Sequence, residues 1–152
     1  MESNKFDFII IGAGSAGCVI ANRLTASGKF RVLLLEAGPS DSSPWIHMPI
    51  GYGRNFSNPK VNWLYSSEPG IDWVKRPIKQ PRGKVLGGSS SINGLVYMRG
   101  QKEDYDHWRQ LGNDGWGYEQ VLDYFKKSEH QERGEDPFHG IGGPLNVSDP
   151  RE

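Results

Sequence analysis

The chain has 152 residues, and its 18 basic and 18 acidic side chains cancel to a net charge of zero. This balance, without any basic run, gives no electrostatic basis for binding nucleic acid or an anionic surface, so no nucleic-acid partner is expected. A single cysteine excludes a disulfide framework, and every apolar run is too short to span a bilayer, so we expect a cytoplasmic protein of about one domain without a membrane span.

The chain begins with a pattern that predicts a strand, a glycine turn and a helix. The apolar run Phe8–Ile11 is typical of a buried parallel strand, and residues 15–27 have the periodicity of a helix that ends at Gly28. A second apolar run, Val32–Leu35, completes the order strand, helix, strand. The helix is expected to bury the apolar residues Ala16, Val19, Ile20 and Leu24.

The turn between strand and helix has the glycine spacing of a dinucleotide-binding unit. In such a unit Gly12 permits the tight turn, Gly14 lets the backbone approach a pyrophosphate, and Gly17 lets the helix pack closely on the strand. The phosphates then face the helix N-terminus, whose first N–H groups lack partners. An ordinary glycine-containing turn would show the same three glycines, but the order and register of the flanking strand and helix favour nucleotide binding.

The acidic residue Glu36 ends the second apolar run. It follows the loop at about the 20-residue distance expected for the acid that binds a ribose hydroxyl. A carboxylate there disfavours NADP, because the 2′-phosphate of that cofactor would meet a negative charge. The unit itself is compatible with both NAD and FAD.

Residues 39–81 lack the periodicity of regular structure. Prolines recur along this stretch with large aromatic side chains between them, so we expect an irregular excursion with little helix and a short strand over 62–65. Such long irregular stretches usually serve as functional loops or pack against another part of the protein. Because the aromatic side chains would otherwise be exposed, we expect contact with a further part of the protein.

A second glycine-rich loop follows within residues 82–100. Gly87 and Gly88 can adopt positive φ, and the three serines after them suit the N-cap of a new helix. That helix is expected to run through Ile92, Leu95 and Val96. The free amides of the loop can bind a second anionic group, with Arg82 and Lys84 either beside that group or in solvent. A flexible linker is the alternative interpretation, but apolar residues on both sides disfavour it.

Two helices and a polar tail complete the chain. Residues 102–111 and Tyr118–Ser128 each carry an aromatic and aliphatic stripe, which is more typical of core packing than of ligand contact. The tail, residues 129–152, is rich in polar residues and glycine, with one strand expected at 144–148. The four histidines show no metal-ligand spacing and the serines at 89–91 lack the G-x-S-x-G pattern, so neither a metal site nor a nucleophilic serine is expected.

The second loop, together with Tyr97-Met98-Arg99-Gly100 downstream, closely resembles a signature of the glucose–methanol–choline oxidoreductases. Residues 7–38 resemble the N-terminal FAD-binding unit of that family, and the similarity covers essentially the whole chain. It is nearest to bacterial choline dehydrogenase and related alcohol dehydrogenases. The resemblance implies an α/β fold with a Rossmann-like FAD-binding βαβ unit, incomplete without a C-terminal substrate-domain region. The implied segments of this N-terminal part, residues 1–152, are the dinucleotide-binding unit 6–38, the excursion 39–81, the second FAD loop 82–100, the helical segments 101–128 and the polar tail 129–152.

By resemblance, two sets of residues bind FAD. The set at the pyrophosphate and the adenosine ribose consists of Gly12, Gly14, Ser15, Ala16, Gly17, Glu36 and Ala37. The set that runs from the adenine side past the pyrophosphate toward the flavin ring consists of Val85, Gly88, Asn93, Gly94, Leu95 and Val96. Family members that bind FAD covalently carry a histidine just before the position of Asn93. Ile92 stands there in this chain, so the FAD is expected to be noncovalent.

The resemblance also implies an enzyme that oxidises a primary or secondary alcohol to a carbonyl, with hydride passing from the alcohol carbon to flavin N5. Its catalytic histidine belongs near the C-terminus of the much longer family members, so no residue of this chain is expected to be catalytic. The expected partners are the remainder of the enzyme, as a further segment or a second chain, and a small alcohol substrate. Two alternatives stay open: a non-catalytic truncated or complementing FAD-binding chain, and a lyase or photodecarboxylase built on the same fold.

Overall fold

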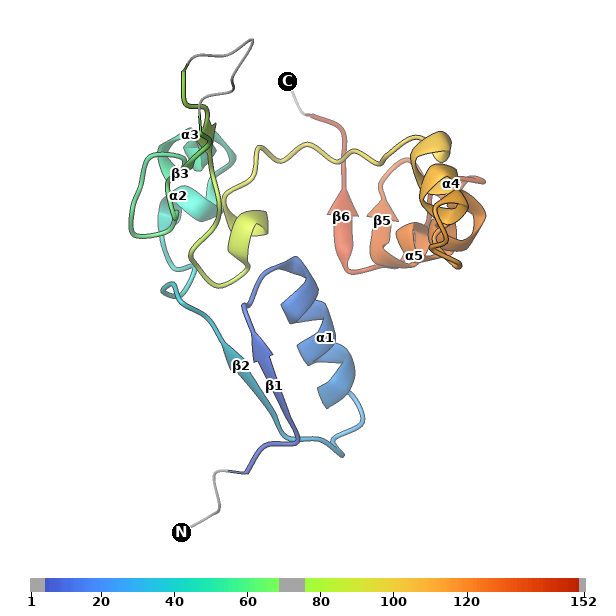
Figure 1. The fold of residues 1–152 in the computed structure, drawn as a ribbon, viewed down its shortest axis with the longest axis horizontal. Helices are drawn as coiled ribbons and strands as arrows, with labels where there is room; N and C mark the ends of the chain where they lie inside the picture. The colour runs from blue at the N-terminus through green and yellow to red at the C-terminus, as the bar shows by residue number, and fades with distance from the viewer. Residues whose placement is uncertain (1–4, 69–75, 151–152) are drawn as a thin grey trace. The chain divides into compact units, whose positions relative to one another are not determined.

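The computed structural model of the protein describes residues 5–68 and 76–150. These residues form two compact units that divide between Val96 and Tyr97. Residues 69–75, which belong to the expected excursion, lie outside the described part, as do residues 1–4 and 151–152 (Figure 1). No helix of the described residues combines the length and the apolar character that crossing a membrane requires.

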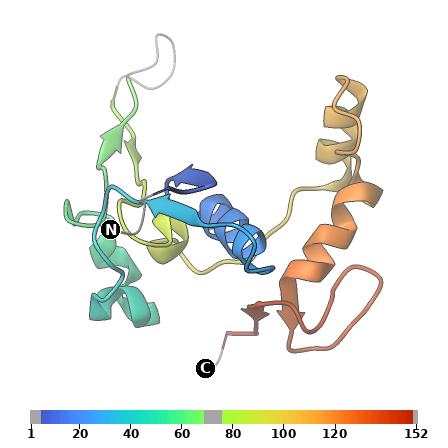
Figure 2. The same ribbon diagram turned by 90° about the horizontal axis from the view of Figure 1, so that it is seen from below.

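The first unit is built around the predicted strand–helix–strand element. β1 (Phe8–Ile11) and β2 (Val32–Leu35) pair in parallel, with Phe8 opposite Val32. α1 (Ser15–Thr25) connects them and packs beside the pair, as both views show (Figure 1 and Figure 2). Gly28 follows the helix with a φ of 68°, a left-handed conformation that glycine adopts without strain. The carboxyl ends of both strands and the N-terminus of α1 therefore lie on one side of the unit.

The apolar stripe of α1 is exposed, contrary to the sequence prediction. Val19 and Ile20 are 57% and 49% exposed, Ala16 is also exposed, and Leu24 is partly buried. The reason is the size of the sheet, which has two strands within the described residues and covers only one side of the helix. The expected burial requires apolar surface that residues 5–68 and 76–96 do not supply.

The helical elements of the excursion are short. α2 (Pro44–His47), the 3-10 turn η1 (Pro49–Gly51) and α3 (Tyr52–Asn55) follow one another along the chain. Pro44 and Pro49 stand at the start of their elements, where a missing N–H is tolerated. The strand expected over 62–65 starts only at its last residue, and β3 (Tyr65–Ser66) pairs antiparallel with β4 (Lys79–Gln80).

A small core anchors the second glycine-rich loop. Val61, Val85 and Ile92 are buried together, with Ile46 packed against them. Val85 and Ile92 flank the 3-10 turn η2 (Gly88–Ser91) on either side in the sequence. Both ends of this turn are therefore held by apolar packing.

The helix predicted through Ile92, Leu95 and Val96 does not form. The loop makes a single 3-10 turn, and Leu95 has a φ of 61°, a left-handed conformation that interrupts a right-handed helix. The serine hydroxyls explain the difference, because Ser90 donates to the carbonyl of Gly87 at 2.6 Å and Ser91 to that of Leu86 at 2.7 Å. They bind back to the preceding turn instead of capping a following helix.

The second unit contains the two predicted helices and a short parallel strand pair. α4 (Lys102–Gln110) and α5 (Tyr118–Ser128) agree closely with the sequence prediction, and Tyr105 meets Phe125 edge-on with ring centroids 5.7 Å apart. β6 (Leu145–Val147) lies within the predicted strand, and it pairs with β5 (Glu129–Gln131), which the sequence does not predict. The three polar residues of β5 show no apolar alternation, so only the pairing identifies it as a strand.

A buried carboxylate, Glu129, organises the second unit. Its side chain is 0% exposed and accepts hydrogen bonds from the Arg99 guanidinium at 2.6 Å and the N–H of Gly140 at 2.8 Å, with Nδ1 of His139 3.2 Å away. Burial by itself raises the pKa of this carboxyl, but the bonds from Gly140, Arg99 and His139 outweigh burial and lower the pKa below its ordinary value. Glu129 is therefore ionised at neutral pH and ties the loop at residues 139–140 to the C-terminal end of α5.

Candidate dinucleotide-binding site

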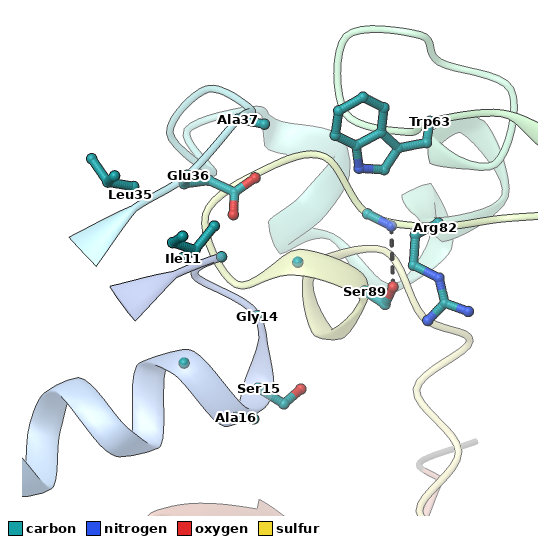
Figure 3. Close-up of a pocket in the computed structure, with 14 residues that line it drawn as sticks. Ile11, Gly14, Ser15, Ala16, Leu35, Glu36, Ala37, Trp63, Arg82 and Ser89 are labelled. Atoms are coloured by element: carbon teal, nitrogen blue, oxygen red, sulfur yellow. Dashed lines mark hydrogen bonds between the residues drawn. The ribbon is translucent and has the colours of Figure 1, made fainter. Parts of the chain in front are cut away.

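A pocket of about 800 Å³ lies where the two glycine-rich loops meet (Figure 3). It is surrounded by the carboxyl ends of β1 and β2, the N-terminus of α1, η2, and the segments at Trp63 and Arg82. Of the residues predicted to bind a dinucleotide, those that line it are Gly12, Gly14, Ser15, Ala16, Gly17, Glu36, Ala37 and Gly88. Residues from both loops thus share one cavity, although the whole excursion separates the loops in the sequence.

The first loop is shaped by close backbone approaches that require glycine. Gly12 has a φ of 96°, and a Cβ at Gly17 would overlap the carbonyl oxygen of Gly12. The N–H of Gly12 donates to the carbonyl of Leu35 at 2.7 Å, so the turn begins while β1 is still bonded to the end of β2. Gly12 and Gly17 therefore occupy the tight turn and the helix–strand contact that their spacing predicts.

The second loop contacts the first directly. The N–H of Gly87 donates to the carbonyl of Ala13 at 2.7 Å, and Ala13 is fully buried. Gly88 has a φ of 59°, and a Cβ added there would lie 2.8 Å from Cα of Gly14. A side chain at Gly88 would push the two loops apart, so their contact depends on this glycine.

Glu36 follows β2 and bonds to the first loop through its carboxylate. Oε2 accepts the N–H of Ala13 at 2.9 Å, and Oε1 accepts the N–H of Gly38 at 3.0 Å. An ionised carboxylate has about four acceptor positions, so the side chain retains capacity for the ribose hydroxyls predicted from the sequence. Glu36 also lines the pocket, which is where this role requires it to be.

The N-terminus of α1 reaches the pocket with uncapped N–H groups. Gly14 at the N-cap forms no side-chain cap hydrogen bond, and the first turn carries no acidic residue. The partial positive charge of this 11-residue helix therefore remains available to an anion. The glycine surface, the uncapped amides, the volume of the pocket and the carboxylate of Glu36 together fit a dinucleotide whose pyrophosphate lies at α1.

The remaining residues of the predicted set lie outside this pocket. The Val85 side chain is fully buried in the core, so only its backbone can reach a ligand. Leu95 and Val96 are 59% and 76% exposed, and Asn93 and Gly94 are exposed as well. The roles that the resemblance gives to these five residues stay predictions.

The pocket is also lined by residues outside the predicted set, namely Ile11, Leu35, Trp63, Arg82, Gly83 and Ser89. For Arg82 the sequence predicts a place either beside an anionic group or in solvent. Ile11 and Leu35 end the two predicted strands, so the strand pattern already signals their position. Trp63 joins the site because its N–H donates to the carbonyl of Arg82 at 2.9 Å. This pairing joins the middle of the excursion to the residue that follows it and has no local sequence signal, so only the tertiary structure brings Trp63 to the pocket.

Comparisons with known proteins agree with this geometry. The family model described as GMC oxidoreductase matches residues 6–152. Among curated proteins, the chain is 50% identical over 145 residues to an alcohol dehydrogenase (acceptor) from Pseudomonas putida, a match that covers 95% of this chain and 26% of the relative. It is 52% identical over 141 residues to an oxygen-dependent choline dehydrogenase from Rhizobium etli, which covers 93% of this chain and 26% of the relative.

A solved structure shows the same fold. The crystal structure of pyridoxine 4-oxidase from Mesorbium loti matches with a TM-score of 0.86 at 35% identity, covering 93% of this chain and 28% of that one. The chain thus spans about a quarter of the length of the curated relatives it matches.

Proposed function

Because the chain belongs to the GMC oxidoreductase family, we propose that it is the N-terminal FAD-binding part of a flavin-dependent enzyme that oxidises an alcohol to an aldehyde or ketone. The family match confirms the resemblance and the Rossmann-like fold class predicted from the sequence. The same membership supports FAD, the cofactor predicted from that resemblance.

One observation carries the FAD part of the proposal: both glycine-rich loops and Glu36 line a single pocket. A helix N-terminus with uncapped N–H groups suits a pyrophosphate, and a carboxylate after β2 suits a ribose with free hydroxyls. A nicotinamide dinucleotide would satisfy the same groups, so the geometry alone does not select the flavin. Family membership decides between the two cofactors.

In this proposal the residues of the chain bind and orient the cofactor. The N–H groups of α1 hold the pyrophosphate, Glu36 accepts from the ribose hydroxyls, and Gly88 keeps the two loops in contact. The bound flavin supplies a hydride acceptor for the alcohol carbon. The group that takes the hydroxyl proton belongs to the part of the enzyme that corresponds to the unmatched sequence of the relatives, so no residue of this chain is assigned as catalytic.

We further propose that FAD is held without a covalent bond. Ile92 occupies the position at which covalent members of the family carry a histidine, and it is 2% exposed in the core with Val61 and Val85. An aliphatic side chain offers no nucleophile to the flavin, and this one is packed against other apolar side chains. The attachment found in covalent members therefore has no counterpart here.

The proposed partner is the remainder of the enzyme, as further sequence or a second polypeptide, and the proposed substrate is a small alcohol. The exposed stripe of α1, with Val19 and Ile20 57% and 49% exposed, supports a protein partner, because exposed apolar side chains on one helix face are normally covered. A cytoplasmic location, expected from the sequence, stays a prediction that cell fractionation would test.

The first experiment identifies the cofactor and its attachment. The purified protein is precipitated with acid, and the flavin in the supernatant is identified by chromatography against FAD and FMN standards. We expect free FAD in the supernatant and a colourless pellet. A coloured pellet would contradict noncovalent binding, and a protein without any flavin that also fails to take up added FAD would contradict the assignment of the pocket.

A second experiment tests the reaction. Residues 6–150 replace the matching segment of the Pseudomonas putida alcohol dehydrogenase, and the chimera is mixed without oxygen with primary and secondary alcohols, choline included. We expect bleaching of the flavin absorption by at least one alcohol that the parent enzyme accepts. A chimera that binds FAD but is not reduced would contradict the oxidoreductase part of the proposal and favour the alternatives of a non-catalytic chain or a different reaction.

A further inference from the structure

The side chain of Arg82 lines the pocket without a partner of its own. It is exposed, and its guanidinium forms no hydrogen bond, ion pair or ring contact with any residue of the described ranges 5–68 and 76–150. Lys84, the other basic residue of this segment, behaves differently: its Nζ lies 4.7 Å from the centre of the Trp63 ring, and it does not line the pocket. Of the two cations, only Arg82 is free to meet a ligand there.

The backbone of Arg82 is fixed although its side chain is free. Its N–H donates to Oδ1 of Asn62 at 3.0 Å. Asn62 is 2% exposed, and its amide nitrogen donates in turn to the backbone carbonyls of Asn55 at 3.3 Å and Phe56 at 3.1 Å. The neighbouring Gly83 donates its N–H to the hydroxyl of Ser89 at 3.1 Å, which joins this segment to η2. This hydrogen-bond network therefore fixes the backbone of Arg82 at the edge of the pocket.

The charges around the pocket are divided between its two sides. Among the lining residues Glu36 carries a negative charge and Arg82 a positive one, and Figure 3 shows Arg82 beside Ser89, across the pocket from Glu36. A pyrophosphate brings two negative charges, whereas the N-terminus of α1 offers about half a positive charge. A guanidinium is well suited to bind the pyrophosphate, because its paired N–H donors match phosphate oxygens in geometry.

We propose that Arg82 is a phosphate-binding residue of the dinucleotide site, which pairs with the pyrophosphate on the side of the pocket opposite Glu36. This inference rests on the proposed FAD site and adds a cationic contact that neither glycine motif requires. It implies that Arg82 contributes to the binding of the cofactor's phosphates and does not change the affinity of the site for the adenosine part.

The test compares three variants of the protein, each freed of flavin and titrated with FAD by fluorescence. Arg82→Gln is expected to weaken FAD binding about ten- to a hundredfold, the loss typical of a hydrogen bond to a charged group. Arg82→Lys should recover part of the affinity, since it keeps the charge and loses the paired donors. Lys79→Gln, in β4, is the matched control for charge, and it should bind FAD as the wild type does because Lys79 does not line this pocket.

Competition with ADP and with adenosine separates a phosphate contact from a general loss of the site. Arg82→Gln should weaken displacement by ADP and leave displacement by adenosine unchanged, and raising the salt concentration should reduce its difference from wild type. Equal affinity of the wild type and Arg82→Gln for FAD would overturn the inference while leaving the FAD site intact. Equal losses for ADP and adenosine would also overturn it, and a wild type that binds no FAD would refute the proposed function as well.

Discussion

Replacing Glu129 with glutamine is expected to destabilise the second unit, because it removes a buried charge and leaves the partner charge behind. The carboxylate is 0% exposed and lies 2.6 Å from Arg99, whose side chain is 12% exposed. Glutamine has nearly the same size and keeps one oxygen that can accept the N–H of Gly140, so no large cavity forms. The substitution therefore isolates the loss of charge.

The magnitude follows from this geometry. Removing one partner of a buried ion pair costs about 3–5 kcal/mol, since the other charge stays buried without compensation. Arg99 keeps a hydrogen bond to the carbonyl of Phe138 at 2.6 Å, so we expect the lower end of this range, about 3 kcal/mol. The matched control is Glu119→Gln, because Glu119 lies 3.2 Å from Lys102 but both side chains are more than half exposed. The same chemical change should cost less than about 1 kcal/mol there.

Hydrogen exchange followed by mass spectrometry on peptides from residues 97–150 measures the free energy of opening of this unit separately from the first. Equal losses of protection for the two variants would refute the reasoning, because burial of the pair would then have no effect.

The lowered pKa of Glu129 also predicts the direction in which its contribution to stability changes with pH. Its contribution is fully present above the ordinary carboxyl pKa of 4.5 and is lost as the pH falls through the lower folded-state value. The stability difference between wild type and Glu129→Gln should therefore shrink in acid, and a difference that persists there would contradict the ion-pair explanation.

Two further predictions concern the dinucleotide site. Glu36→Ala should weaken FAD binding by about 1.5–3 kcal/mol through loss of a charged acceptor, as measured by equilibrium dialysis, and an unchanged affinity would contradict the ribose assignment. Gly17→Ala should lower the stability of the first unit by about 1–3 kcal/mol and impair FAD binding, because the added methyl group overlaps the carbonyl oxygen of Gly12. Gly53→Ala is its control, since an added Cβ at this position in α3 meets no atom within 4 Å, and thermal unfolding should show little change or a small gain.

Local sequence patterns were sufficient to predict a strand, helix or turn wherever the residues of that element alone determine its structure. The apolar runs predict β1 and β2, the helical periodicity predicts α4 and α5, and the glycine spacing predicts the turn before α1. All seven residues of the predicted pyrophosphate and ribose set line one pocket, because the carboxyl ends of parallel strands and the following helix N-terminus necessarily lie together. That part of the candidate site follows from chain order alone.

Predictions went wrong where a side chain had two local options or needed a distant partner. The serines after Gly88 could cap a new helix or bind the preceding turn, and the structure shows the second arrangement. The periodicity of α1 predicts a buried stripe, but burial depends on a covering surface that the described residues of the first unit do not provide. The polar strand β5 appears only through its pairing with β6.

The sequence by itself determined the strand–helix–strand unit, the family resemblance and the identity of the glycines and the acid that shape the pocket, because these features depend on short-range geometry and residue type. Only the tertiary structure decided that the two loops touch through Gly14 and Gly88, that Trp63 lines the pocket together with Arg82, and that Arg99 pairs with a fully buried Glu129. The physical reason is that such contacts depend on long-range hydrogen bonds and on burial, which arise when segments far apart in the chain pack together.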